Sequence, residues 1–434
     1  MGRAAADADV LVVGAGPVGL AAAVHARAAG LDVLVVDHRA GTLDKACGEG
    51  LLPGALRAVQ ALGADPPGHV LTGISYRAPG RHADHEFTAG PGRGVRRTAL
   101  HEALRARAAD VGARRTYGRV TALRQDAAGV EIEVTPGRGG GVDRAGGAGR
   151  VGGEASGNGA ANGVGGDTAR DAAGDTAGDT TADGGAGAPG GPSAAGEPVT
   201  LRARWLLGCD GLHSTVRRLA GLDVQPGRRA GSGVVQGAGR DAGRGAGPPA
   251  RHRYGLRRHF AVAPWTDLVE VHWSPHAEAY VTPVAAGVVG VALLAPRTVT
   301  GAGFDTLLRS QFPELAARLA GAEPAGTVLG AGPLRRRSRR RSTGRVRLVG
   351  DASGYVDALT GEGVRVGLAQ ADAAVRHLED PAAYERAWRT VTRDYRVLTS
   401  GLLAWAESPA RGAIVPAAAR APWLYGTIVD RLAR

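Results

Sequence analysis

The sequence predicts an α/β protein, in which a mainly parallel sheet with flanking helices is interleaved with an antiparallel sheet and followed by a helical C-terminal segment. An apolar run over residues 10–13 leads through a glycine-rich turn into a helical pattern. Residues 260–294 alternate between apolar and polar side chains and are rich in Val, Tyr and Trp, as antiparallel strands are. From Glu362 onward the apolar residues recur at helical spacing.

The N-terminal glycine turn predicts a Rossmann-type dinucleotide-binding site. A buried apolar strand ends at Gly14, and a helix over residues 17–29 begins at Pro17. Side chains at Gly14 and Gly16 would keep a pyrophosphate away from the backbone, while Gly19 lets the helix pack closely on the strand. We expect the amides at the start of this helix to face the phosphates.

A carboxylate follows the second predicted strand. Asp37 closes this apolar run at a distance from the glycines where an acid accepts both hydroxyls of an adenosine ribose. Arg39 follows it and joins the expected cofactor contacts. Because glycine makes up 70 of the 434 residues, the glycine pattern alone is weak evidence. The strand before it, the helix after it and the acid give the pattern its weight.

Two later segments indicate which dinucleotide is bound. One is Cys209-Asp210-Gly211, and the other is Gly350-Asp351, after an apolar strand and before Gly361-Glu362-Gly363. At the end of that strand the Asp351 carboxylate can accept hydroxyls of a ribityl chain. The glycines at 361 and 363 can open a helix whose amides face the pyrimidine edge of a flavin. The alternative for Asp351 is that it only caps a helix.

Together the three segments resemble the flavoprotein family of the para-hydroxybenzoate-hydroxylase fold, which includes aromatic hydroxylases, geranylgeranyl reductases and flavin halogenases. The resemblance implies FAD as the cofactor, with Asp210 near its pyrophosphate and Asp351 on its ribityl chain. It also implies that Arg97 binds the FAD phosphates at a helix start and that the backbone at Val120 brackets the adenine. Arg96 competes for the role of Arg97, and a solvated surface arginine is the alternative.

Residues 45–53 resemble the Cys-Gly loop of the geranylgeranyl reductase branch, which in that family passes close to the isoalloxazine ring. Lys45 is the only lysine among the 53 Lys and Arg residues. Its compact ammonium is expected to pair with phosphate or with the reduced flavin. Cys47 is either a polarizable contact on the ring or a small buried thiol, and Gly48 is expected to contact the cofactor. Lys45 and Cys47 are the two candidates for a catalytic role, whereas Glu49 is expected beside a helix N-terminus.

The late motif departs from the aromatic hydroxylases. Ser353-Gly354 and Gly361-Glu362-Gly363 are nearer to the reductase branch, although Ala358 stands where that branch has proline. No Trp-x-Trp-x-Ile-Pro run occurs, which argues against a tryptophan halogenase. No cysteine or histidine cluster has the spacing of metal ligands, so we expect no metal site.

The formal net charge is +12, which favours anionic cofactors or an anionic surface as partners. The densest run of arginines, residues 335–341, lacks interleaved aromatic residues, so we expect a solvated hairpin and no nucleic-acid partner. Two cysteines in unrelated motifs suggest a reducing cytoplasm, and we expect no signal peptide and no transmembrane segment. The amphipathic C-terminal helices suit packing over the active site or a peripheral membrane contact.

The predicted domains are discontinuous. Residues 136–198 form a Gly/Ala/Asp-rich insertion between two neighbouring strands, and we expect this insertion to be disordered. A second, shorter tract of this kind covers residues 230–249. The remaining chain divides into an FAD-binding domain (1–70, 92–135, 199–227 and 342–380), a substrate domain (71–91 and 228–341) and C-terminal helices (381–434).

These observations predict an FAD-dependent oxidoreductase that uses NADPH or NADH on a small lipophilic substrate. The leading hypothesis is a monooxygenase that transfers one oxygen atom from O2 to an aromatic or polyketide-type metabolite. The alternative is a reductase of the geranylgeranyl reductase type that saturates isoprenoid double bonds. A basic binding protein on a vestigial flavin fold is the second alternative. Asp210-Gly211 favours hydroxylation, and the late glycines favour reduction.

Overall fold

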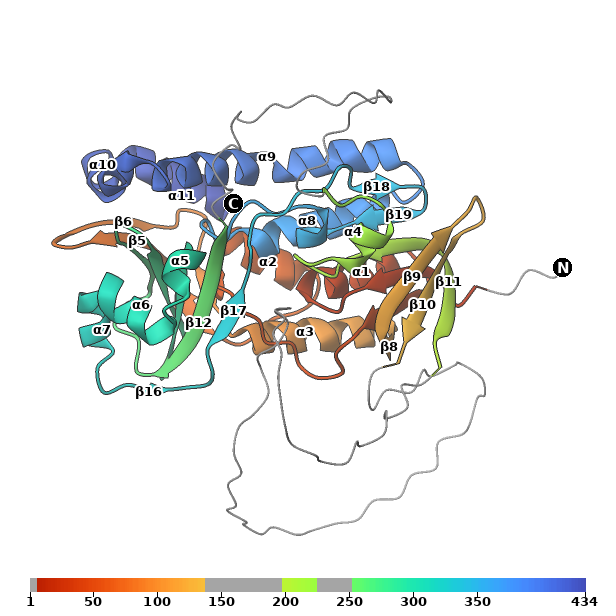
Figure 1. The fold of residues 1–434 in the computed structure, drawn as a ribbon, viewed down its shortest axis with the longest axis horizontal. Coiled ribbons are helices and arrows are strands. Elements are labelled where there is room, and N and C mark those ends of the chain that lie inside the picture. Colours follow the sequence, from red (N-terminus) through yellow and green to blue (C-terminus); the bar gives the residue numbers. More distant parts are fainter. Residues whose placement is uncertain (1–5, 137–196, 225–251) are drawn as a thin grey trace, which may run out of the picture. The chain divides into compact units, whose positions relative to one another are not determined.

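The computed structural model describes residues 6–136, 197–224 and 252–434 (Figure 1). The insertion at 136–198, which is expected to be disordered, lies outside the described residues except at its two ends. The second tract, at 230–249, also lies outside them. The fold class agrees with the expectation, because the structure contains a parallel-centred sheet with helices, an antiparallel sheet and C-terminal helices.

The first sheet is mixed, with a parallel centre. β1 (Ala8–Val13) lies between β2 (Val33–Asp37) and β11 (Val199–Gly208) and is parallel to both. β8 (Arg114–Tyr117) continues the parallel order beside β2, and β19 (Val346–Leu348) continues it beside β11. Since parallel strands end at the same edge of a sheet, the glycine turn, Asp37, the Asp210 segment and the Gly350 segment all begin at one edge.

Both faces of this sheet are covered, which explains the continuous apolar runs of its strands. On one face Val10, Val12 and Val35 pack in an apolar cluster with helices α1 (Pro17–Ala28), α2 (Pro53–Ala61), α3 (Arg97–Asp110) and α8 (Gly363–Arg376). On the other face Leu11 and Val13 pack with β9 (Arg119–Gln125), β10 (Val130–Thr135) and α4 (Thr215–Leu219). α1 ends one residue earlier than expected, and α8 ends at Arg376, where residue 378 was expected.

β10 pairs antiparallel with β11, so that Val134 lies opposite Val199. The expectation that these two segments are neighbouring strands is therefore confirmed. The remaining short strand of this sheet, β18 (Ser342–Thr343), pairs with β19, and η1 (Gly350–Ser353) follows β19 as one turn of 3-10 helix.

The second sheet confirms the predicted antiparallel strands after residue 252. β13 also pairs in parallel with β5, which brings in a hairpin from near the N-terminus. The strands in spatial order are β16 (Glu323–Pro324), β12 (Arg253–Ala261), β15 (Val288–Pro296), β14 (Glu278–Ala285), β13 (Leu268–Trp273), β5 (Gly73–Ala78) and β6 (Arg81–Glu86), with β17 (Leu329–Ala331) beside β12. A small third sheet joins β3 (Gly50–Leu51), β7 (Gly92–Gly94) and β4 (His69–Leu71).

Helices cover both faces of the second sheet. α6 (Phe304–Gln311) and α7 (Pro313–Arg318) pack on one face, next to the short α5 (Arg297–Thr300). On the other face, Trp273 and Tyr280 share an apolar cluster with the C-terminal helices, which are drawn in blue in Figure 1. These are the end of α9 (Pro381–Ala406), then η2 (Pro409–Ala413), α10 (Ile414–Arg420) and α11 (Pro422–Ala433).

Local chemistry sets the start of α9. The Asp380 carboxylate accepts hydrogen bonds from the backbone N–H groups of Ala382 and Ala383, at 2.9 and 2.8 Å, which caps the first turn. The helix is longer than the expected residues 382–403 at both ends. None of the described helices is long and apolar enough to cross a membrane. On α11 the side chain of Trp423 is 73% exposed.

Candidate cofactor site

The glycine turn is held by close backbone packing. Gly14 has φ of +105°, and a Cβ atom there would lie 2.5 Å from the carbonyl oxygen of Cys209. A Cβ on Gly19 would lie 1.8 Å from the carbonyl oxygen of Gly14, which confirms that this glycine lets the helix approach the strand. A Cβ on Gly16 would meet no atom within 4 Å. Gly14 is thus required by the close approach of Cys209, the residue that follows β11, and Gly16 leaves open space. Pro17 occupies the first turn of α1.

Asp37 ties the end of β2 to this turn. Its Oδ2 accepts a hydrogen bond from the Ala15 N–H at 2.6 Å, and its Oδ1 accepts one from the Arg39 N–H at 2.9 Å. The described contact of Arg39 is thus made by its backbone, while its side chain is exposed. The Gly118 N–H donates to the Asp37 carbonyl oxygen at 2.8 Å. Val120, two residues later, packs its side chain into the core, so only its backbone is available to a ligand.

His101 stabilises the same turn and was not identified from the sequence. Its side chain is 0% exposed, and its Nε2 donates to the Ala15 carbonyl oxygen at 3.0 Å. Its Nδ1 accepts a hydrogen bond from the Leu43 N–H at 3.3 Å. Burial lowers the pKa of His101, which agrees with a neutral ring in this arrangement. One helical histidine carries no sequence signal that distinguishes this role.

The middle motif is joined to the late motif. Asp210 accepts from the Ser214 hydroxyl at 2.5 Å and from the Val216 N–H at 3.0 Å, which organises the start of α4. Arg217 is 4% exposed and donates to the Ala352 carbonyl oxygen at 3.1 Å. It also donates to the Leu212 carbonyl oxygen at 2.9 Å, so one guanidinium group connects the middle motif to the late motif.

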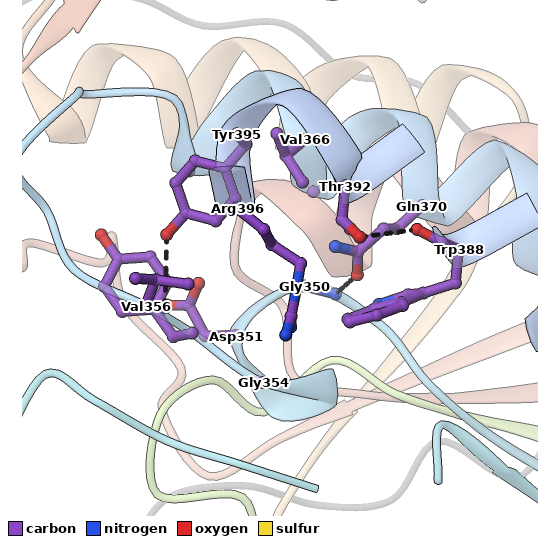
Figure 2. A pocket seen from close by; sticks show the side chains of 13 residues that line it. Gly350, Asp351, Gly354, Val356, Val366, Gln370, Trp388, Thr392, Tyr395 and Arg396 are labelled. Carbon is purple, nitrogen blue, oxygen red and sulfur yellow. Dashed lines mark hydrogen bonds between the residues drawn. The ribbon is translucent and has the colours of Figure 1, made fainter. Parts of the chain in front are cut away.

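The late motif is anchored from α8 and α9. Gln370 accepts hydrogen bonds from the Gly350 N–H at 2.8 Å and the Ser353 hydroxyl at 2.9 Å, as Figure 2 shows for Gly350. The Trp388 indole N–H donates to the Ser353 hydroxyl at 2.8 Å. In the described part of the chain the Asp351 carboxylate accepts no hydrogen bond and caps no helix, which counts against the capping alternative.

Lys45 brings the separate motifs together. Its Nζ atom lies 3.3 Å from where a Cβ on Gly211 would be. Burial lowers the pKa of Lys45, the Asp351 carboxylate raises it, and the Arg97 and Arg39 guanidinium groups lower it. Burial raises the pKa of Asp351, and Lys45 and Arg97 lower it. These mutual effects bring Lys45, Asp351 and Arg97 into one electrostatic cluster.

The residues fit an anionic dinucleotide. The Nε atoms of Arg96 and Arg97 are buried and have no hydrogen-bond partner in the structure, so both arginines retain an unused donor. Gly16, Gly48 and Gly361 each leave the space of a Cβ atom unfilled. Gly363 opens α8, whose first amides lack intrahelical partners. The described residues therefore offer unsatisfied donors and open backbone, as FAD requires.

The Cys47 loop is bonded to the antiparallel sheet and to helix α3. The Cys47 thiol accepts from the Glu49 N–H at 3.4 Å, and the Gly48 carbonyl oxygen accepts from the Thr282 hydroxyl at 2.8 Å. The Glu49 Oε1 accepts from the Arg97 N–H at 2.9 Å, which places Glu49 at the N-terminus of α3 as expected. Glu49 also has φ of +59°, a conformation that costs free energy for a residue other than glycine.

From the sequence, His259 is expected to be an ordinary strand histidine, and the structure gives it specific partners. It is buried, its Nδ1 accepts from the Arg257 guanidinium at 2.8 Å, and its Nε2 lies 2.6 Å from the Glu49 Oε2. Because Nδ1 accepts, Nε2 carries the proton and donates it to the carboxylate. Arg257 also pairs with Asp44. Hydrogen bonds and ion pairs therefore connect the Cys47 loop to β12.

An apolar cluster lies against the segment that follows the late motif. Tyr280 of β14 donates its hydroxyl to the Leu359 carbonyl oxygen at 2.7 Å. Leu359, Tyr355 and Val356 pack in the same cluster as Trp273. Burial raises the pKa of Tyr355, and the negative charges of neighbouring groups, among them Asp351 and Cys47, raise it further.

The sequence was compared with known protein families. Residues 7–145 and 183–279, more than half of the chain, match the family model described as an FAD binding domain. The chain belongs to this FAD-binding family. It is an FAD-dependent oxidoreductase of the para-hydroxybenzoate-hydroxylase fold, and its predicted resemblance is confirmed.

Curated relatives match over a part of the chain. A menaquinone reductase of Mycolicibacterium smegmatis is 44% identical over 120 residues, which are 26% of this chain and 29% of that protein. A menaquinone reductase of Mycobacterium tuberculosis is 37% identical over 140 residues, or 30% of this chain and 34% of that protein. The chain therefore spans about a third of the length of these relatives.

Solved structures match over nearly the whole chain. A triple mutant of the flavin-dependent brominase Bmp2 gives a TM-score of 0.69 at 13% identity and covers 98% of this chain and 94% of its own. The anhydrotetracycline hydroxylase OxyS from Streptomyces rimosus gives 0.60 at 20% identity, with 98% and 75% covered. At these identities the comparisons establish the fold.

Proposed function

We propose that this oxidoreductase is a reductase that takes electrons from NADPH or NADH and saturates a double bond of a lipophilic, isoprenoid-type substrate. The observation that carries this proposal is the Cys47 loop, which the buried Glu49–His259 bond holds against the substrate sheet. The partial similarity to menaquinone reductases supports the same reaction class. Bound FAD would supply hydride transfer to the substrate.

The chain's own residues would position the cofactor and exclude water. Gly16 and Arg97 would hold the phosphates, and Asp351 the ribityl chain. Lys45 would balance negative charge there, since its Nζ atom lies close to Gly211 and the Asp351 carboxylate raises its pKa. The apolar cluster around Leu359 would accept a hydrocarbon substrate and keep water from the reacting atoms.

Turnover with and without oxygen tests this proposal. Purified protein is supplied with NADPH and a short-chain prenylated naphthoquinone, and the product is followed by mass spectrometry. We expect substrate-dependent NADPH oxidation without oxygen and a product that is still two mass units heavier after any naphthoquinol has been reoxidised to the quinone in air. Strict dependence on O2, with a product one oxygen atom heavier, would overturn this reaction.

The second candidate function is the monooxygenase reaction on a lipophilic aromatic or polyketide-type metabolite. The Asp210-Gly211 segment favours it, since this motif is retained and bonded through Arg217 to the late motif. The same turnover assay distinguishes the two reactions. Family membership and the unsatisfied donors around Lys45 argue against a basic binding protein on a vestigial flavin fold.

We further propose the domain division given above, a cytoplasmic location and a peripheral membrane contact through α11. Trp423, Leu424 and Ile428 are exposed on this helix, and Arg420 and Arg434 lie near its two ends. Aromatic and apolar side chains flanked by cations suit the interface of an anionic membrane. A lipophilic substrate would be taken up from such a surface.

A further inference from the structure

α9 carries a stripe of arginine side chains that the cofactor site does not use. Arg386, Arg389, Arg393 and Arg396 follow one another at intervals of three and four residues, so they share one face of the helix. All four are exposed. The stripe lies beside Arg341, from the arginine-rich segment that precedes β19.

Four of these arginines line a groove. Arg341, Arg389, Arg393 and Arg396 surround Trp388 in a hollow of about 310 Å³. The guanidinium carbons of Arg341 and Arg396 lie 4.0 and 5.2 Å from the centre of the Trp388 ring, which fixes both side chains by cation–π contacts. The segment at 335–341 is therefore partly packed against α9, where the sequence indicated only a solvated hairpin.

The protein balances the charge in this groove only in part, because Arg341 is paired with Glu385 at 3.4 Å. In the described ranges of the chain, no carboxylate forms an ion pair with Arg389, Arg393 or Arg396. The nearest acid in sequence, Asp394, pairs with Arg431. The Nε of Arg341 is buried without a hydrogen-bond partner.

The neighbouring positive charges act on the pKa of Arg396. Its pKa is lowered by burial and by the neighbouring Arg341, Arg337 and Arg335 guanidinium groups. Protein stability alone does not favour such a concentration of like charges. A multivalent anion would relieve the repulsion and satisfy the unused donors.

We propose that this groove binds the phosphate groups of a small phosphorylated ligand. Guanidinium groups bind phosphate oxygens in bidentate pairs, and four converging on one hollow match a diphosphate. Arg396 extends from α9 towards the Gly350–Gly354 segment, between Tyr395 and Trp388 (Figure 2). The ligand would thus lie on the outer side of the late motif, and the inference does not depend on the reaction proposed above.

Calorimetric titration of the full-length, FAD-loaded protein with inorganic pyrophosphate tests the site. The variant Arg389→Ala/Arg393→Ala/Arg396→Ala removes the stripe, and Arg309→Ala, an exposed arginine on α6, is the matched control. We expect the parent and the control to bind pyrophosphate equally. We expect the affinity of the triple variant to be lower by about tenfold or more. Thermal unfolding checks that each variant is folded, and Arg393→Gln serves if the triple variant is not.

Absence of binding in the parent, or equal binding by the parent and the triple variant, would overturn the proposal. Competition then identifies the source of the phosphate. Displacement of pyrophosphate by NADPH or NADH would identify a nicotinamide coenzyme. Displacement by phosphatidylglycerol vesicles, and not by phosphatidylcholine vesicles, would identify a lipid headgroup. Displacement by neither would assign the groove to a smaller phosphorylated compound.

Discussion

The Glu49 carboxylate accepts a hydrogen bond from His259 Nε2 at 2.6 Å, across 210 positions of sequence. Glu49 belongs to the loop beside the cofactor site, and His259 belongs to β12 of the substrate sheet. A bond between them makes the position of the loop depend on the sheet.

Breaking this bond should destabilise the protein. Glu49→Ala leaves the Nε2–H of His259 buried without its acceptor, while Arg257 keeps its pairing with Asp44, and a buried donor left unsatisfied costs about 1–3 kcal/mol. Urea unfolding followed by circular dichroism measures the change. His276→Ala, an exposed histidine in the same region, is the control and should unfold with the parent. Equal stability of Glu49→Ala and the parent would show that the network contributes little.

Lys45→Met should slow the reduction of the flavin by NADPH without unfolding the protein. The ammonium lies in the electrostatic cluster with Asp351, so its loss removes positive charge from the cofactor site. Arginine should restore the rate only in part, because its wide fork does not replace a compact ammonium. Stopped-flow traces that overlay those of the parent would remove Lys45 from the site and leave the FAD assignment in place.

Asp351→Ala should weaken FAD binding strongly. Asp37→Ala should disturb the flavin spectrum little. Asp351 is expected at the ribityl chain and Asp37 at the distant adenosine ribose. Each lost charge-assisted hydrogen bond is worth about 1.5–3 kcal/mol. Asp37→Ala should also lower the unfolding temperature, because its carboxylate holds Ala15 and Arg39. Equal spectral changes in both variants would place the two motifs at the wrong ends of the cofactor.

Stability should fall with rising pH because of Glu362. Burial raises the pKa of Glu362 from 4.5 to about 7, and Arg365 only partly opposes this effect. A carboxyl whose pKa is higher in the folded protein stabilises the fold while it is protonated. Its contribution, on the order of 1–3 kcal/mol, is therefore present below pH 4.5 and is lost as the pH rises to about 7.

Denaturant unfolding at pH 5 and pH 8 measures this dependence. Glu362→Gln should reduce the difference in unfolding free energy between the two values. Asp357, whose pKa burial raises to about 6, contributes a second part in the same direction. Asp357→Asn should therefore remove only that part. An unchanged pH dependence in Glu362→Gln would show that this carboxyl is charged throughout.

Trp423→Ser should reduce binding to vesicles that contain phosphatidylglycerol. The exposed indole is the largest apolar side chain available on α11 for insertion into a bilayer interface. Co-sedimentation with vesicles measures the bound fraction, and Val70→Ser changes an exposed apolar residue elsewhere as the control. Equal binding by both variants would exclude α11 as the membrane contact.

The sequence was sufficient for the elements whose evidence is local. The apolar strand before Gly14, the glycine turn and the alternating strands after residue 252 each depend on residues close in the chain. Lys45 stood out because the sequence contains one lysine among its 53 basic residues, and its Nζ atom lies close to Gly211, where the Asp351 carboxylate raises its pKa. These positions could be predicted because backbone geometry and charge leave a pattern within a short window.

The interactions between the motifs could not be predicted. Arg217 donates a hydrogen bond to the Ala352 carbonyl oxygen, and His101 donates one to the Ala15 carbonyl oxygen. The sequence around either residue has no pattern that distinguishes it from an ordinary surface residue. His259 was expected to be an ordinary strand histidine, because the alternation of apolar and polar residues around it is found in any half-buried strand. Its partner Glu49 comes from a loop whose path depends on tertiary packing. Helix ends also differed by one to three residues, since caps and neighbours decide them.

The pairing of Val134 with Val199 identifies where the polypeptide can be divided. The two residues face each other in an antiparallel ladder, so the strands on either side of the insertion are held by hydrogen bonds and side-chain packing as well as by the chain between them. Two separately expressed fragments, ending after β10 and beginning at β11, should therefore reassemble through this ladder. New termini opened here would also permit a circular permutation, because closing a long connection costs little more than closing a shorter one.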